Sequence, residues 1–131
     1  MGASHCAHFA KQGATVILAD RDRAAAEATA ESLTHNSPGK AIFVPLDVGS
    51  KEQWTAAIGH VEATYGRLDV LVNNAGIIRL GSTEELSVED REAVFAVNVR
   101  GVFLGSQAAI PLILSKGQPV SVAARMPTDG C

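Results

Sequence analysis

Apolar positions along the chain form two patterns: short continuous runs, and longer stretches in which alanine and other apolar residues recur at helical spacing. The short runs are typical of strands that are buried on both faces. The pattern predicts strands at 14–19, 41–46 and 68–73, and a shorter one at 119–124. It predicts helices at 3–12, 22–33 and 50–65, and a long one that starts after Ser87.

Several helix limits carry local signals. Gly13 follows the first predicted helix, where a left-handed residue commonly ends a helix. Ser50 and Gln53 have the spacing of a capping box. Ser87 is expected to cap the long helix, and Pro111 is expected to kink or end it. The apolar positions expected to form the broad face of that helix are Val94, Phe95, Val97, Val102 and Phe103.

The alternation of strands and helices predicts the α/β class, with a doubly wound parallel sheet and helices on both faces. A chain of 131 residues with 47% hydrophobic content has the size of one domain. We expect residues 1–117 to form a partial domain of this kind and residues 118–131 to form a divergent tail.

Charge and composition argue against several partners. A net charge of -3 offers no basic field to nucleic acid or anionic lipid. The apolar runs are shorter than the roughly 20 residues of a spanning helix, and no signal-peptide pattern opens the chain, so we expect a cytoplasmic protein without a membrane partner. Cys6 and Cys131 lie far apart, and His5 and His8 have no neighbours that complete a ligand set, so no metal site is expected.

Polar residues follow each predicted strand of the first half. Asn73-Asn74-Ala75-Gly76 stands at the carboxyl end of the third strand, the edge at which open α/β sheets bind ligands. Two short polar side chains and a glycine let the backbone approach a ligand there. Asn and Gly also favour ordinary turns, so these residues alone leave a plain turn equally open.

Acidic residues end the first two predicted strands. A carboxylate at Asp20 can accept hydrogen bonds from adenosine ribose hydroxyls and repel a 2′-phosphate, which favours NAD over NADP. Asp20 could instead cap the next helix, and Arg21 or Arg23 could accommodate a phosphate. Asp47 with Val48, read alone, is just as easily a strand-to-helix turn.

These segments together resemble the short-chain dehydrogenase/reductase family from Gly2 to about Gly117. Asn73 to Gly76 resembles its N-N-A-G motif, and Asp47-Val48 resembles its D-V pair beside the adenine ring. The resemblance implies a Rossmann-like fold and a cofactor site at Gly2, Asp20, Arg21, Asp47, Val48, Asn74, Ala75 and Gly76.

Asn98 lies in a segment that resembles the family helix with the catalytic asparagine. In the family this asparagine interrupts regular helix geometry and helps to hold a water in a proton relay. Without the resemblance, a lone asparagine inside a helix usually points to solvent. Asn98 is the one catalytic residue that the resemblance assigns to this chain.

The resemblance fails at both ends. Gly2 aligns with the last glycine of the family's T-G-x-x-x-G-x-G turn, which holds the pyrophosphate. The family's first strand, which is central in the sheet, is therefore expected to be absent. Each unpaired buried amide or carbonyl costs about 1–3 kcal/mol, so we expect the isolated chain to be marginally stable.

At the other end, Arg125 and Met126 stand where the family's serine is expected, and Ser121 falls too early. No tyrosine follows Tyr65 and no lysine follows Lys116, so the family's Tyr-x-x-x-Lys acid–base pair is expected to be missing.

Two functions are open. The first is NAD(P)-dependent hydride transfer between an alcohol and a carbonyl in a parent protein, with this chain inactive and binding dinucleotide weakly. The second is a non-enzymatic fragment that pairs with an intact family member, or with itself, through the helix 88–114, a segment that commonly forms the family's subunit interface. The missing Tyr-x-x-x-Lys favours the second for this chain.

Overall fold

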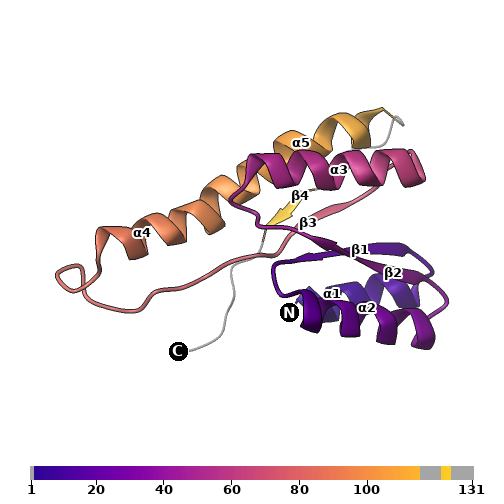
Figure 1. Cartoon of the computed structure of the whole chain (residues 1–131), viewed down its shortest axis with the longest axis horizontal. Coiled ribbons are helices and arrows are strands. Elements are labelled where there is room, and N and C mark those ends of the chain that lie inside the picture. Colours follow the sequence, from indigo (N-terminus) through magenta and orange to yellow (C-terminus); the bar gives the residue numbers. More distant parts are fainter. Residues whose placement is uncertain (1, 116–121, 125–131) are drawn as a thin grey trace. The chain divides into compact units, whose positions relative to one another are not determined.

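Strands and helices alternate along the chain in a computed structural model of the protein, which describes residues 2–115 and 122–124 (Figure 1). The elements in chain order are α1 (Gly2–Lys11), β1 (Thr15–Asp20), α2 (Arg23–Asn36), β2 (Lys40–Pro45), α3 (Lys51–Tyr65), β3 (Leu71–Asn73), α4 (Val88–Phe95), η1 (Ala96–Gly101), α5 (Val102–Leu114) and β4 (Val122–Ala124).

The described strands pair in parallel. β1 pairs with β2, with Val16 opposite Ala41, and β3 pairs with β4, with Val72 opposite Ala123. Parallel strands need a crossover connection, and helices supply it here. The prediction of an α/β fold with a parallel sheet is therefore confirmed.

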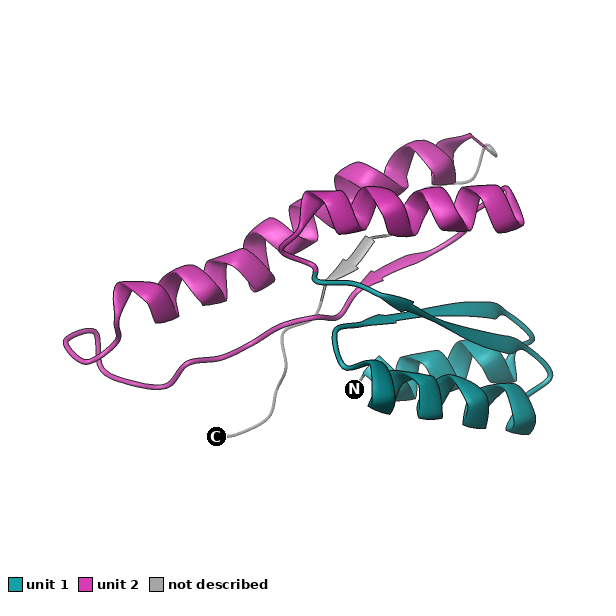
Figure 2. Ribbon diagram, viewed as in Figure 1, with its two compact units in different colours: residues 1–47 teal, residues 48–131 magenta. Residues whose placement is uncertain are grey.

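The chain divides into two compact units, residues 1–47 (unit 1) and residues 48–131 (unit 2) (Figure 2). β3 begins later than the sequence pattern predicts, and β4 lies within the predicted strand 119–124. Most of the expected tail 118–131 lies outside the described residues, so its limit stays a prediction.

Unit 1 packs its helices and strands around small side chains. Gly39 is central to this packing, because its amide donates a 3.0 Å hydrogen bond to the carbonyl of Ala10. A β-carbon at position 39 would lie only 2.2 Å from the carbonyl oxygen of Ala14. The buried cluster consists of Ala10, Val16, Ala30 and Ala41. Cys6 packs against it, and burial raises the pKa of its thiol.

Side chains cap the helices of unit 2 at the predicted positions. The hydroxyl of Ser50 accepts a hydrogen bond from the amide of Gln53 at 3.3 Å, and that of Ser87 accepts one from the amide of Asp90 at 3.0 Å. Each cap satisfies an amide that has no partner within its helix. The predicted starts of α3 and α4 are therefore confirmed.

The long helix of unit 2 runs through α4, η1 and α5, and its middle part is a π-helix. Of the two outcomes expected at Pro111, an end of the helix is wrong, since α5 continues to Leu114, and a kink stays a prediction. Leu112 and Ile113 are buried in the core, and this packing holds the turn that contains the proline.

Phe95 and Phe103, two of the positions expected on the broad apolar face of the long helix, are exposed, with exposed fractions of 50% and 61%. The wider turn of the π-helix changes the angular spacing of residues, so a regular helical period does not carry through it. The buried positions are Gly101, Leu104, Gly105, Ala109, Leu112 and Ile113, and α5 packs against α3 and β3.

By length and composition alone, the continuous helix Val88–Leu114 is able to cross a membrane, which the short apolar runs did not predict. Core helices of soluble proteins pass the same test, and α5 has a buried face within unit 2. The helix therefore gives only weak support for a membrane span.

Candidate functional site

The turn after β3 is built into the core of unit 2. The side chain of Asn73 is buried, with 7% exposed, and its Nδ2 donates to the hydroxyl of Ser106 at 3.5 Å. The amide of Asn74 donates to the carbonyl of Val72 at 3.1 Å, which turns the chain at the end of the strand. The buried Oδ1 of Asn74 has no hydrogen-bond donor among the described residues. This turn therefore combines a fixed backbone with an acceptor that no described group satisfies.

Asn98 holds the segment that follows this turn. Its Oδ1 accepts a 2.9 Å hydrogen bond from the amide of Ile77, and its Nδ2 donates a 2.8 Å bond to the carbonyl of the same residue. Asn98 lies in the π-helix η1, which agrees with the irregular helix implied by the resemblance. Single π turns are frequent at functional sites. The alternative that this side chain points to solvent is wrong.

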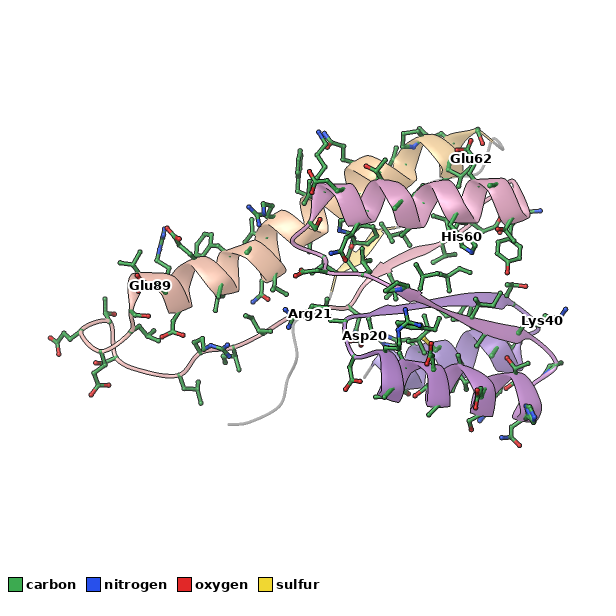
Figure 3. All side chains as sticks on the ribbon, in the orientation of Figure 1. Asp20, Arg21, Lys40, His60, Glu62 and Glu89 are labelled. Carbon is green, nitrogen blue, oxygen red and sulfur yellow. The ribbon has the colours of Figure 1, made fainter. Side chains whose placement is uncertain are left out.

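Asp20 ends β1 at the carboxyl edge of the β1–β2 pair in unit 1, where Figure 3 labels it beside Arg21. Its Oδ1 accepts a 3.0 Å hydrogen bond from the amide of Asp22. The N-cap of α2 is Asp22, whose own carboxylate accepts from the amide of Ala25. Asp22, and not Asp20, is therefore the residue that caps α2.

The structure brings three predicted site residues together at this edge of unit 1. The amide of Leu46 donates to the carbonyl of Asp20 at 3.0 Å, which joins the ends of the two strands. Arg21 faces Asp47 with 3.9 Å between charged atoms, and both side chains are well exposed. Exposed pairs of this kind contribute about 0–1 kcal/mol, so Arg21 is held only loosely.

Arg23, the second candidate for a phosphate contact, is occupied elsewhere. Its guanidinium pairs with Glu27 at 2.7 Å and lies over the ring of Phe43, 5.3 Å from the centroid. These contacts lie along α2 and on β2. Arg21 is therefore the arginine that stays close to the predicted site.

The remaining predicted site residues have different surroundings. Val48 belongs to unit 2, where its carbonyl accepts a 3.0 Å hydrogen bond from the indole of Trp54. Gly2 is the first residue of α1. Ala75 is exposed and Gly76 is half-buried. Ser121, Arg125 and Met126, which bear on the missing serine, lie outside the described residues.

Four residues that support the site were missed from the sequence: Trp54, Gly101, Gly105 and Ser106. A β-carbon at Gly101 would lie 2.9 Å from a methyl of Val48, and Gly105 faces Trp54 and Asn73 with similar closeness. The available signal was the pair of glycines four residues apart in an apolar helical stretch, because helical glycine usually has a packing reason. No group of three or more potential metal ligands occurs within 2–115 and 122–124.

Parallel strands joined by helices, with polar turns at the carboxyl ends of β1, β2 and β3, define a Rossmann-like nucleotide-binding fold. A sequence model of the family described as short chain dehydrogenase matches residues 1–128. The chain belongs to this family.

Two curated relatives illustrate the match. The cyclopentanol dehydrogenase of Comamonas sp. (strain NCIMB 9872) is 43% identical over 111 residues, which cover 84% of this chain and 44% of the relative. The trans-4-hydroxycyclohexanecarboxylate dehydrogenase of Sinomonas cyclohexanicum is 43% identical over 122 residues, which cover 89% and 47%. The chain therefore spans less than half the length of these relatives.

Solved structures share the fold. An alcohol dehydrogenase from the archaeon Thermococcus sibiricus, complexed with 5-hydroxy-NADP, has a TM-score of 0.83 and 26% identity over 92% of this chain and 51% of its own. A short-chain dehydrogenase/reductase mutant from Serratia marcescens has a TM-score of 0.82 and 34% identity over 92% and 49%.

Proposed function

We propose that this chain is the dinucleotide-binding part of an oxidoreductase that transfers hydride between NAD(P) and an alcohol or carbonyl. The observation that carries the proposal is the turn Asn73–Gly76, which follows β3 and continues into the segment held by Asn98. A fixed backbone at this edge suits a ligand that the chain must approach closely. The names of the two relatives, both dehydrogenases, support the same chemistry.

The proposed contacts follow from the chemistry of each group. α1 begins at Gly2, so its first amides lack partners within the helix and suit a phosphate. Asp20 accepts hydrogen bonds from the adenosine ribose, and Asp47 with Val48 lies beside the adenine. Asn74, Ala75 and Gly76 line the cofactor, with the buried Oδ1 of Asn74 available as an acceptor.

We propose a preference for NAD over NADP. A carboxylate at Asp20 repels a 2′-phosphate, and Arg23 is engaged by Glu27 and Phe43. Arg21 stays near Asp47 and is the one basic residue at this edge that the proposal leaves open to a phosphate. The complex of the Thermococcus sibiricus protein with 5-hydroxy-NADP keeps NADP as the alternative.

Calorimetric titration of the full chain with NAD and NADP tests this function. We expect weak binding with the smaller Kd for NAD, and we expect Asp20→Asn to reduce the preference about tenfold, which corresponds to about 1.4 kcal/mol. Asp69→Asn is the matched control, because it makes the same change at an exposed ion pair with Arg67. Equal or tighter binding of NADP, or an unchanged ratio in Asp20→Asn, would overturn the preference. No binding of either cofactor would overturn the function.

We propose further that this chain does not turn over substrate. Its sequence has no tyrosine after Tyr65 to serve as the family's general acid and base. A positioned acid or base contributes roughly 10²–10⁴ in rate, and Asn98 cannot replace it because a carboxamide side chain does not ionise near neutral pH. NADH oxidation with a panel of carbonyl compounds tests this, and activity that copurifies with the chain through every step would contradict it.

A second function is favoured by an exposed apolar stripe on the long helix. The stripe consists of three residues at intervals of four along the helix, Phe95, Val99 and Phe103, which are 50%, 56% and 61% exposed. We propose that this stripe pairs with the same helix of another copy or of an intact family member. Sedimentation should detect the association and should show its loss in Phe103→Glu. The proposal would be contradicted if the chain is monomeric at all concentrations and also does not bind an intact family member.

A further inference from the structure

A close approach inside unit 2 connects α5 with the turn after β3. A β-carbon built on Gly105 would lie 2.7 Å from Cζ2 of Trp54 and 2.8 Å from Oδ1 of Asn73. Carbon atoms in contact are normally about 3.5–4.0 Å apart, so any side chain at position 105 would displace one of these neighbours. Both neighbours are buried.

Each of the two neighbours of Gly105 belongs to, or bonds to, a different segment that is predicted to contact the cofactor. Asn73 opens the turn that continues through Gly76, and its Nδ2 also bonds to Ser106 beside Gly105. Trp54 donates its indole N–H to the carbonyl of Val48. One turn of α5 therefore contacts both Asn73, which starts the turn Asn73–Gly76, and the indole of Trp54, which bonds to Val48.

We propose that Gly105 is a positioning residue: its missing side chain lets Asn73 and Trp54 close on α5, and this sets the backbone of the turn Asn73–Gly76 for the dinucleotide. The proposal rests on the proposed dinucleotide-binding function. Gly105 touches no cofactor itself and acts through Asn73. Its van der Waals contact with the ring of Trp54 is the packing part of the same arrangement, and the two parts can be separated by substitution.

The variant Gly105→Ala adds one methyl group at this contact. Its matched control is Gly59→Ala, because Gly59 lies within α3 and a β-carbon there meets nothing within 4 Å. Both changes replace a helical glycine by alanine and gain the same helix propensity. Only the first inserts atoms next to Asn73. We expect Gly105→Ala to raise the Kd for NAD about tenfold in the folded protein and Gly59→Ala to leave it unchanged.

The double variant Trp54→Phe/Gly105→Ala separates positioning from packing. Phenylalanine lacks the outer ring atoms Cζ2 and Cη2 of the tryptophan, which are two of the three atoms nearest to the added methyl. We expect the double variant to unfold at a higher urea concentration than Gly105→Ala but to keep the weakened NAD binding, because the contact with Asn73 remains and the bond from the indole to the carbonyl of Val48 is lost as well. It also provides a folded protein if Gly105→Ala alone does not fold.

NMR spectra of the full chain without cofactor keep the outcomes distinct. The backbone amides of Asn74, Ala75 and Gly76 and the side-chain amide of Asn73 should shift in Gly105→Ala and in the double variant, and should not shift in Gly59→Ala. If wild-type protein binds no NAD but these shifts occur, the proposed function fails and the positioning role stands. Unshifted signals, a wild-type Kd in Gly105→Ala, or full recovery of NAD binding in the double variant would overturn the role of Gly105.

Discussion

The predicted site residues at the ends of β1 and β3 are held in different ways. At the end of β1, Asp20 bonds to an amide two residues away, and Arg21 meets Asp47 in an exposed pair. After β3, the contacts reach 21 residues to Asn98 and 33 residues to Ser106. The side chains of the first group are thus held by one local bond and one exposed pair, whereas those of the second group make part-buried bonds that depend on the fold of unit 2. Substitutions at the first should change binding alone, and substitutions at the second should change stability as well.

The largest expected effect tests whether unit 1 tolerates substitutions at its site residues but not in its packed interior. Gly39→Ala places a methyl against the carbonyl oxygens of Ala14 and Ala10, which are backbone atoms that cannot rotate away. We expect a loss of about 3 kcal/mol in the free energy of unfolding, at the upper end of the usual range for overpacking. Urea unfolding measures it, with Gly59→Ala as the control. A loss below about 0.5 kcal/mol, the size of an ordinary surface substitution, would show that the turn at Gly39 yields easily.

A smaller loss in the free energy of unfolding is expected for the group of residues after β3. Asn98→Ala removes both hydrogen bonds to Ile77 and leaves a half-buried amide and carbonyl without these partners, which should cost about 2 kcal/mol. Asn98→Asp keeps an acceptor for the amide of Ile77 but no donor for its carbonyl, so its loss should be intermediate. Urea unfolding of the three proteins provides the comparison. Equal stability of wild type and Asn98→Ala would remove the contrast between the two strand ends.

The smallest effect concerns a local contact of the kind that holds Asp20. The backbone amide of Glu52 and the hydroxyl of Ser50 bond to the Glu52 carboxylate and hold its pKa below the ordinary value of 4.5. A lowered folded-state pKa contributes stability above about pH 4.5, and this contribution is lost as the pH falls through the folded-state pKa. Wild type should therefore be slightly more stable than Glu52→Gln at pH 7, with the difference shrinking toward pH 3. A difference that grows as the pH falls would reverse the assigned sign.

The parts of the fold that sequence could predict are those set by local signals. The caps at Ser50 and Ser87 act within a few residues, and the carboxylate of Asp20 ends a strand whose apolar run is continuous. Each can be recognised from neighbours in the chain. The strand ends and helix starts were therefore largely predictable.

The missed features depend on contacts between distant parts of the sequence. Gly39 is a helix breaker in the sequence, but its need for glycine comes from Ala14 across the turn. The π-helix around Asn98 changes the helical period from which the broad apolar face with Phe95 and Phe103 was predicted. Packing between elements, rather than helix propensity, decides which residues fit at such positions. The sequence pattern of a single helix does not reveal that packing.

A residue-resolved titration of the full chain with NAD tests most directly the proposal that this chain binds a dinucleotide. We expect the backbone amides of the proposed contact residues to shift in NMR spectra, namely those of Asp20 and Arg21 in unit 1 and those of Asn74, Ala75 and Gly76 in unit 2. In Asp20→Asn the same signals should respond at higher NAD concentrations, while the spectrum without NAD stays close to that of the wild type. Unchanged signals at the proposed contact residues, or an unchanged response in Asp20→Asn, would contradict the proposed binding of NAD.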